Sequence, residues 1–322
     1  MTLLTVGKFR GLQQCASPHG TFTFLALDHR QNLRRANPGF QDDAALSRFK
    51  LDVLKELAPE ATAVLLDPEF SAAQAVAGGI LPKHVGLTVA LEATGYGGEP
   101  TARQSRILPG WSVAKAKGMG ADAVKLLVYY HPQSRTASEI ETFVQNVAGE
   151  CRRFDLALML EPLSYSLEED RRLTAEEKRF VVVETARRLT PLGVDLLKAE
   201  FPLSPEGGDE DGWLAACAEI SAASRAPWIL LSAAVDYETY IRQVIVACRA
   251  GASGVAVGRA AWQESVQMDG DARLAFLRTT GRARLSRLTA LCLALAKPWT
   301  DFYSAAAPLD WFETYGTLDE RP

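Results

Sequence analysis

Short apolar runs recur along the chain, and each is followed by a longer segment with helical periodicity. The runs are rich in leucine or β-branched residues and end in polar or small side chains, as strands of a covered parallel sheet do. Eight such runs span residues 21–28, 61–67, 85–92, 121–130, 156–163, 194–202, 227–234 and 251–260. The pattern therefore predicts an α/β protein in which strands and helices alternate.

The intervening segments predict helices, several of which begin after Ser, Thr or Asp. These helices span 42–58, 104–118, 136–153, 174–190, 209–225, 236–250 and 271–296, and residues 70–79 give the weakest signal. Eight consecutive strand–helix units are the number that closes a (β/α)8, or TIM, barrel. A doubly wound open sheet is the alternative. No linker divides the chain, so we expect one domain over 1–322 with the barrel at about 20–296.

The remaining segment, about 297–322, is too aromatic for a solvated tail. Its aromatic residues are Trp299, Phe302, Tyr303, Trp311, Phe312 and Tyr315. We expect this C-terminal extension to pack along the barrel or against a second subunit, and therefore expect a homo-oligomer.

Composition narrows the function. The net charge is −4 with a pI near 5.7, and the basic residues are dispersed, which argues against a nucleic-acid partner. Five widely spaced cysteines form no C-x-x-C pair, and no apolar stretch is long enough for a signal peptide or a membrane span. We expect a cytoplasmic protein that does not contact membranes.

Polar residues follow most of the predicted strands. In a TIM barrel the chemistry lies at the carboxyl ends of the strands, so these residues are site candidates. They are Asp28, His29, Asp67, Glu92, Lys125, Glu161, Lys198, Glu200, Ser232, Gly258 and Arg259. Any single one of them is as easily a helix cap or a salt-bridged rim residue, but so many titratable groups inside one ring must perturb one another.

Two lysines stand out in this set. Period-two alternation places Lys198 and Lys125 on single strand faces, and two inward ammonium groups would approach each other. A second positive charge and desolvation both disfavour protonation of a lysine, and a neutral amine attacks a carbonyl. This is the chemistry of a Schiff-base lysine at Lys198, with Glu161 on the adjacent strand to move protons and Asp28 across the barrel to bind hydroxyls or position the amine.

The last two strands suggest a phosphate site. Small residues and a helix start follow them at Ser232, Ala233, Gly258 and Arg259, where barrels often bind phosphate through backbone N–H groups. The same residues also suit plain packing.

No metal or organic cofactor is expected. The four histidines lack paired ligand spacing, and the glycines at 95–98 do not form a dinucleotide fingerprint. His29 and His131 follow strands and are either site residues or ordinary loop histidines.

These runs resemble the class I tagatose 1,6-bisphosphate aldolases and the related aldolases that cleave 6-deoxy-6-sulfofructose 1-phosphate. The motifs are "ALDHRQNLRR", "LLDPEF", "LEATGY", "AVKLLVYYHP", "LEPLSY", "DLLKAEFP", "LLSAAVDYETYIRQV" and "GVAVGRAAWQE". The resemblance implies that Lys198 is the Schiff-base lysine and that Glu161 is the proton-transfer residue. It further implies that Lys125 corresponds to the family's lysine on strand four. It also implies that Asp28 matches the family's aspartate and that Ser232 and Arg259 hold the phosphate of the dihydroxyacetone phosphate half.

The chain departs from the family after Asp28, where the family usually reads D-Q-R and this chain has His29 and Gln31. The distal group of the substrate therefore stays open between phosphate, sulfonate and an uncharged end.

We expect a class I aldolase that cleaves a ketose 1-phosphate into dihydroxyacetone phosphate and an aldehyde. Glu92, Gln31, Ala233 and Gly258 would contact the substrate, and Glu200 would point to the rim or to another cation because a tight pair with Lys198 would keep that amine charged. The alternatives are a sugar-phosphate isomerase or epimerase on the same barrel, or a non-catalytic sugar-phosphate sensor.

Overall fold

The computed structural model describes residues 1–204, 209–233 and 235–315, and in it eight parallel strands close into a barrel. The order around the ring is β10-β11-β2-β3-β4-β7-β8-β9. The strands are β2 (Phe22–Ala26), β3 (Ala63–Leu66), β4 (Gly86–Ala90), β7 (Ala123–Tyr129), β8 (Ala157–Leu163), β9 (Leu196–Ala199), β10 (Trp228–Leu231) and β11 (Gly254–Val257). Each lies within a run predicted as a strand, so the TIM barrel is confirmed and the open sheet is excluded.

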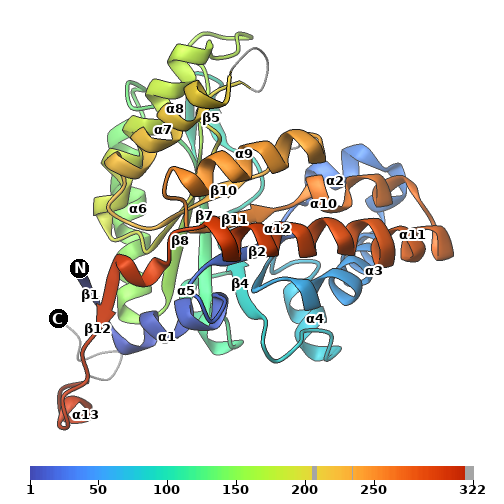
Figure 1. The fold of residues 1–322 in the computed structure, drawn as a ribbon, viewed down its shortest axis with the longest axis horizontal. Helices are drawn as coiled ribbons and strands as arrows, with labels where there is room; N and C mark the ends of the chain where they lie inside the picture. Colours follow the sequence, from blue (N-terminus) through green and yellow to red (C-terminus); the bar gives the residue numbers. More distant parts are fainter. Residues whose placement is uncertain (205–208, 234, 316–322) are drawn as a thin grey trace.

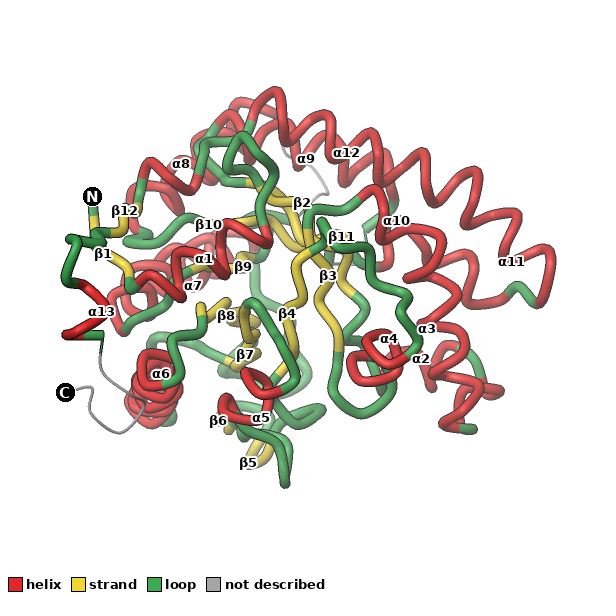
Figure 2. Tube along the Cα trace, turned by 90° about the horizontal axis from the view of Figure 1, so that it is seen from below, coloured by secondary structure: helices red, strands yellow, loops and turns green. Residues whose placement is uncertain are grey.

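Helices surround the strands, as the ribbon and tube views show (Figures 1 and 2). They are α3 (Asp43–Leu57), α4 (Ala72–Ala77), α5 (Val113–Gly118), α6 (Ala137–Arg153), α7 (Ala175–Leu189), α8 (Glu210–Ala223), α9 (Tyr237–Arg249), α11 (Gly270–Phe276) and α12 (Arg282–Leu295). A short π-helix, Leu277–Gly281, joins α11 to α12. No helix in the described ranges is long and apolar enough to cross a membrane.

The prediction of a helix over 104–118 is wrong in its first part. Residues Gly97–Glu99 (β5) and Ala102–Gln104 (β6) form a small antiparallel hairpin, and the helix begins only at Val113. Ser112 caps that helix by accepting a hydrogen bond from the backbone N–H of Lys115 at 3.2 Å. The hairpin projects from the edge of the molecule beside α5 (Figure 2).

Several short elements were given no predicted range, although a helix start was expected after the last barrel strand. They are β1 (Thr2–Leu4), α1 (Val6–Cys15), α2 (Gln31–Ala36), α10 (Arg259–Trp262), β12 (Tyr303–Ala305), α13 (Trp311–Thr314) and the 3₁₀ turns Pro38–Gln41, Ala58–Glu60, Thr190–Leu192, Gln263–Gln267 and Trp299–Asp301. Of these, α2 and α10 matter for function because each follows a barrel strand at its carboxyl end.

The barrel interior is apolar in its lower layers. Inward side chains such as Phe24, Leu65, Met159 and Ile229 are buried together in one cluster. Further along each strand the inward residues become polar, because side chains alternate with period two and the next inward positions carry charged groups. The apolar layers therefore lie directly beneath the layer of polar residues.

Helix α1 closes the amino-terminal end of the barrel. Leu12 and Cys15 belong to the buried interior cluster, and Lys8 forms a buried ion pair with Asp195 at 2.7 Å. Close approach is possible because position 11 is glycine: a Cβ there would lie 2.2 Å from the backbone oxygen of Asp122.

The C-terminal extension splits in two. Trp299 and Tyr303 are buried in the interior cluster, and β12 pairs in parallel with β1. Helix α13 projects from the body beyond β12 (Figure 1), and Leu309 and Phe312 are exposed there. The predicted segment 297–322 continues past the described residues at position 316, and the predicted strand 227–234 includes position 234, which also lies outside them.

We predict that Gly11→Ala destabilises the protein by about 1–3 kcal/mol, because the added methyl forces α1 away from the barrel. Gly149→Ala is the matched control: Gly149 lies in the exposed middle of α6 with no atom near the added Cβ, so the variant should gain about 0.5–1 kcal/mol. Urea unfolding checks both, and equal midpoints for the two variants would contradict the role assigned to α1.

Candidate active site

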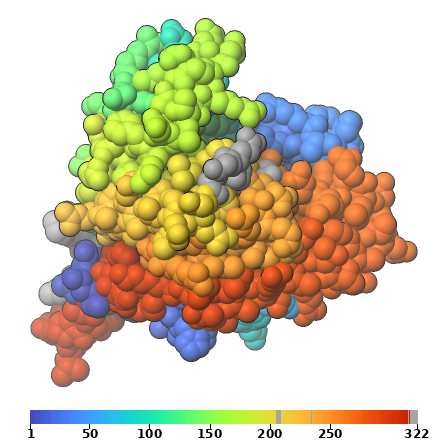
Figure 3. All heavy atoms as spheres, turned by 45° about the horizontal axis from the view of Figure 1, so that its top comes forward, coloured from blue at the N-terminus to red at the C-terminus, as the bar shows by residue number. Residues whose placement is uncertain are grey.

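A cavity of about 530 Å³ opens at the carboxyl ends of the strands. The space-filling view shows a hollow at this end, between the lime-coloured residues that precede α7 and the blue region of α2 (Figure 3). Every residue predicted to act in catalysis or to bind substrate lines it: Asp28, His29, Gln31, Glu92, Lys125, Glu161, Lys198, Ser232, Ala233, Gly258 and Arg259. Their roles stay predictions, but the fold does bring them to one place.

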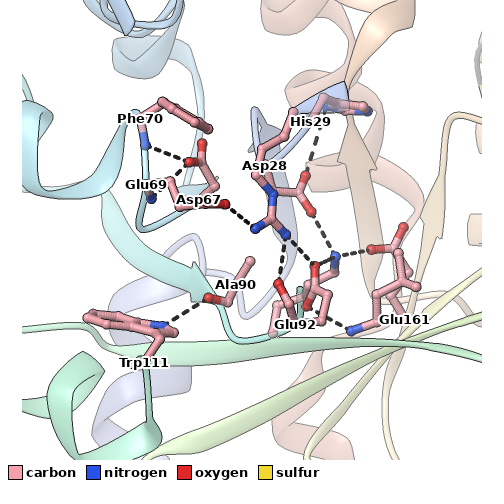
Figure 4. A network of polar contacts seen from close by, with 12 residues as sticks. Asp28, His29, Asp67, Glu69, Phe70, Ala90, Glu92, Trp111 and Glu161 are labelled. Atoms are coloured by element: carbon pink, nitrogen blue, oxygen red, sulfur yellow. Dashed lines mark hydrogen bonds and ion pairs between the residues drawn. The ribbon is translucent and has the colours of Figure 1, made fainter. Parts of the chain in front are cut away.

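Lys125 is the centre of the polar layer and is fully buried. Its Nζ lies 2.8 Å from Asp28 Oδ2, 2.7 Å from Glu92 Oε1 and 2.7 Å from Glu161 Oε2. Figure 4 shows the three carboxylates converging on one point. Burial acts to lower the pKa of Lys125, but the three carboxylates outweigh it and hold that pKa well above its usual value.

Glu161 connects the two lysines. Its Oε1 lies 2.9 Å from Lys198 Nζ, while its Oε2 contacts Lys125. Burial acts to raise the pKa of Glu161, but the two ammonium groups outweigh it and the pKa is lowered, so the carboxylate is ionised at neutral pH. The sequence analysis expected direct repulsion between the lysines; the structure places a carboxylate between them, and the charge of Lys125 is compensated.

Asp28 is ionised for the same reason. Burial would raise the pKa of Asp28, and Lys125 followed by Lys198 reverses the effect and holds it well below its usual value. The neighbouring His29 behaves differently: burial dominates and lowers its pKa to about 4, so the ring is neutral at pH 7. His29 Nδ1 is buried, 4.0 Å from Asp28 Oδ1, and has no hydrogen-bond partner among the described residues.

Arg30 was missed by the sequence analysis. It lines the cavity and links the backbone of Glu92 to the side chain of Glu69. Its Nη1 lies 2.5 Å from Glu69 Oε2, and its Nη2 donates to the backbone oxygen of Glu92 at 2.7 Å. The only sequence signal was its place in "DHRQNLRR" directly after a strand. Asp67, also a strand-end candidate, does not line the cavity; it forms a fully buried ion pair with Lys50.

The last two strands form a separate corner of the cavity. The Gly258 N–H donates to Ser232 Oγ at 3.3 Å, and Ala233 has a left-handed backbone with φ of 43°. Such a conformation costs a residue with a Cβ about 1–3 kcal/mol and is concentrated at functional sites. Arg259 is half-buried here, and its Nε has no hydrogen-bond partner among the described residues.

Two other polar candidates lie near the rim. Glu200 accepts a hydrogen bond from the Ser164 N–H at 2.7 Å, and within the described ranges it forms no ion pair with Lys198. His131 does not line the cavity; its Nδ1 accepts from the Gln133 N–H at 3.1 Å. Across the parts of the chain that the structure describes, no three His, Cys, Asp or Glu side chains are grouped so as to hold a metal ion.

A closed (β/α)8 barrel carries two lysines and three carboxylates at the carboxyl ends of its strands, where barrel enzymes have their active sites, and a lysine beside a carboxylate suits a lyase that acts on carbonyl compounds. Comparison with known proteins agrees. The model of the "DeoC/LacD family aldolase" family matches residues 22–264. The chain belongs to this family and is an aldolase.

Relatives and solved structures give the same picture. Tagatose 1,6-diphosphate aldolase 2 of Streptococcus mutans is 31% identical, over 93% of this chain and 98% of its own length. The tagatose 1,6-diphosphate aldolase of Lactococcus lactis is 31% identical, over 93% of this chain and 99% of its own length. An archaeal fructose 1,6-bisphosphate aldolase matches the fold with a TM-score of 0.60 at 22% identity, over 89% of this chain and 99% of that one. Fructose-bisphosphate aldolase of Plasmodium falciparum matches with a TM-score of 0.73 at 13% identity, over 92% and 98%.

We predict that Lys125→Met destabilises the fold by about 3–5 kcal/mol at pH 7, because three buried carboxylates lose their counter-ion. In the parent, the lowered pKa values of Asp28 and Glu161 give stability that is present above the ordinary carboxyl pKa and lost as pH falls through the folded values. In the variant these carboxyls take up protons more readily. The difference in free energy of unfolding between parent and variant should therefore narrow from pH 7 to about pH 4.

Urea unfolding of both proteins at the two pH values measures this. Lys55→Met, at an exposed position of α3, is the matched control and should stay within about 0.5 kcal/mol of the parent. A difference that does not change with pH would contradict the proposed role of the carboxylates.

Proposed function

We propose that this aldolase cleaves a ketose 1-phosphate reversibly into dihydroxyacetone phosphate and an aldehyde, through an imine on Lys198. The observation that carries the proposal is Glu161, whose two carboxylate oxygens contact Lys198 at 2.9 Å and Lys125 at 2.7 Å at the floor of the cavity. A nucleophilic amine and an ionised base thus stand side by side, as imine chemistry requires.

Imine formation follows from this contact. Glu161 takes a proton from the Lys198 ammonium, and the neutral amine attacks the C2 ketone of the substrate. A proton passes from nitrogen to oxygen to give the carbinolamine. Glu161 then returns its proton to the carbinolamine hydroxyl, which leaves as water, so the iminium forms and Glu161 is ionised again.

Cleavage uses the same base. Glu161 accepts the proton of the C4 hydroxyl, the C3–C4 bond breaks, and its electron pair moves into the iminium to give an enamine while C4 becomes the aldehyde. Lys125 supports this step because it keeps Glu161 and Asp28 ionised. Asp28 is positioned to accept a hydrogen bond from a substrate hydroxyl.

The phosphate on C1 fits the corner formed by Ser232, Gly258 and Arg259. A half-buried guanidinium with a free Nε, next to a turn and the first residues of α10, attracts an oxyanion. The names of the relatives favour a sugar phosphate as substrate, and tagatose 1,6-bisphosphate and 6-deoxy-6-sulfofructose 1-phosphate belong in any substrate panel. The homo-oligomer and the cytoplasmic location expected from the sequence stay predictions.

We predict that borohydride added with dihydroxyacetone phosphate reduces an imine and attaches the triose to Lys198, which peptide mass spectrometry would locate. Lys198→Ala should lose both trapping and turnover. Lys115→Ala, at an exposed position of α5, is the control that should keep both. Turnover by Lys198→Ala, or label on a different lysine, would refute the assignment.

We also predict that Glu161→Gln lowers kcat for cleavage by about 10²–10⁴-fold, because the amide keeps the shape and cannot take a proton. A coupled assay for dihydroxyacetone phosphate measures the loss, and circular dichroism checks the fold. Unchanged turnover would remove Glu161 from the proton path. Substrate that is isomerised with its carbon skeleton intact would favour an isomerase or epimerase instead.

A further inference from the structure

The cavity holds few positive charges that are free to meet a ligand. Its lining includes five cations: Arg30, Arg35, Lys125, Lys198 and Arg259. Three of them already contact carboxylates, since Arg30 pairs with Glu69, Lys125 with three acidic residues and Lys198 with Glu161. Within the described ranges, Arg35 and Arg259 alone of the five form no ion pair.

Both free cations lie on the same side of the barrel. Arg259 follows β11, and α2, which carries Arg35, follows the adjacent strand β2. Asn32 joins Arg259 in lining both the cavity and a neighbouring pocket of about 670 Å³. Arg35 lies three residues after Asn32 in α2 and therefore shares its helix face. One anionic group of a substrate thus has a binding place on this side.

The opposite side of the cavity is aromatic. Strand β7 lies four places from β11 around the ring of eight, and its Tyr129 packs edge-to-face with Tyr96 at 5.0 Å between ring centroids. Leu163, at the end of β8, extends this wall, and the carboxylate of Glu200 follows on the next strand. We call these two tyrosines, Tyr96 and Tyr129, together with the aliphatic Leu163 beside them, the aromatic wall.

The cation next to the aromatic wall, Arg103, stacks on tyrosine rings. The Arg103 guanidinium is stacked on Tyr96, Tyr165 and Tyr129 at 4.4, 4.7 and 5.3 Å from the ring centroids, and its Nε donates to the Pro100 oxygen at 3.0 Å. Arg103 is not among the described residues that line the cavity. An anion placed against this wall from inside the cavity would lose water without meeting an unpaired lining cation, whereas tyrosines and a leucine suit the C–H and hydroxyl groups of a sugar.

We propose that the site takes a ketose with a single anionic group, the phosphate on C1 held at the Arg259 side, and an uncharged distal end packed on the aromatic wall. This rests on the proposed function and narrows it, because it sets the chain apart from relatives named for a bisphosphate. The aldehyde released or condensed is then uncharged.

The test uses condensation, which can be run whatever the stereochemistry of the natural ketose. Dihydroxyacetone phosphate is held constant and kcat/KM is measured for glyceraldehyde, glyceraldehyde 3-phosphate and 3-sulfolactaldehyde. We expect glyceraldehyde to be favoured at least tenfold over both charged aldehydes. A preference for either charged aldehyde would overturn the inference, and loss of that preference in Arg103→Gln would identify the group that binds the anion.

A gain-of-function variant gives a second readout. Thr94→Arg places a cation at an exposed position that lines the cavity after β4, and should raise kcat/KM for glyceraldehyde 3-phosphate relative to glyceraldehyde about tenfold. Leu214→Arg on the exposed face of α8 is the charge-matched control and should leave the ratio unchanged. An unchanged ratio in Thr94→Arg would mean that the distal group lies elsewhere and would overturn the placement.

Failure of this inference and failure of the proposed function give different results. Borohydride trapping with dihydroxyacetone phosphate alone does not involve the distal end. Trapping on Lys198 together with a preference for a charged aldehyde would refute only the single-anion substrate. Absence of trapping would refute the Schiff-base mechanism itself.

Discussion

The ammonium group of Lys125 is the ion on which the site depends. It stands on β7 and contacts carboxylates that follow β2 and β4 and one that lies on β8, so a single buried charge joins four strands of the ring. A buried cation with three acidic partners fixes their side chains without help from solvent. Glu161 is therefore oriented towards Lys198 before any substrate enters, which in the proposed mechanism keeps reorganisation at the moment of reaction small.

The surroundings of this ion are arranged in shells. Below it lie the apolar layers of the barrel, and beside it Arg30 ties Glu92 to Glu69. Further out, Lys50 and Asp67 form a second fully buried ion pair between α3 and the end of β3. The Lys50–Asp67 pair does not line the cavity; it ties α3 to the end of β3, next to the segment after β2 from which Asp28 and Arg30 project.

Much of this arrangement was predictable from the sequence, because two rules act locally. Period-two alternation turns Lys125 and Lys198 inward, and closure of a parallel ring brings all carboxyl ends of the strands to one face. Those rules predicted the barrel and the gathering of the named strand-end residues in one cavity. They do not fix side-chain contacts, so the carboxylate between the lysines and the pairing of Arg30 with Glu69 were out of reach.

Other misses have the same origin in long-range structure. Helix α1 buries Leu12 and Cys15 against a barrel end that exists only after the ring has closed, so its short sequence carries a weak signal. The hairpin at 97–104 was not predicted, and only residue 104 lay in the predicted helix 104–118, because its strands are only three residues each and pair with each other rather than with the sheet.

The closed amino-terminal end of the barrel determines how substrate enters and how products leave. With α1 and Trp299 packed against the filled interior, the cavity has its opening on the other side, at the strand ends. In the part of the chain that the structure describes, this opening is the route to the cavity for substrate and products. In the proposed mechanism, one product is still covalently held on Lys198 after the carbon–carbon bond breaks, while the other is free. That mechanism orders release: the aldehyde leaves first, and water then enters to free the triose.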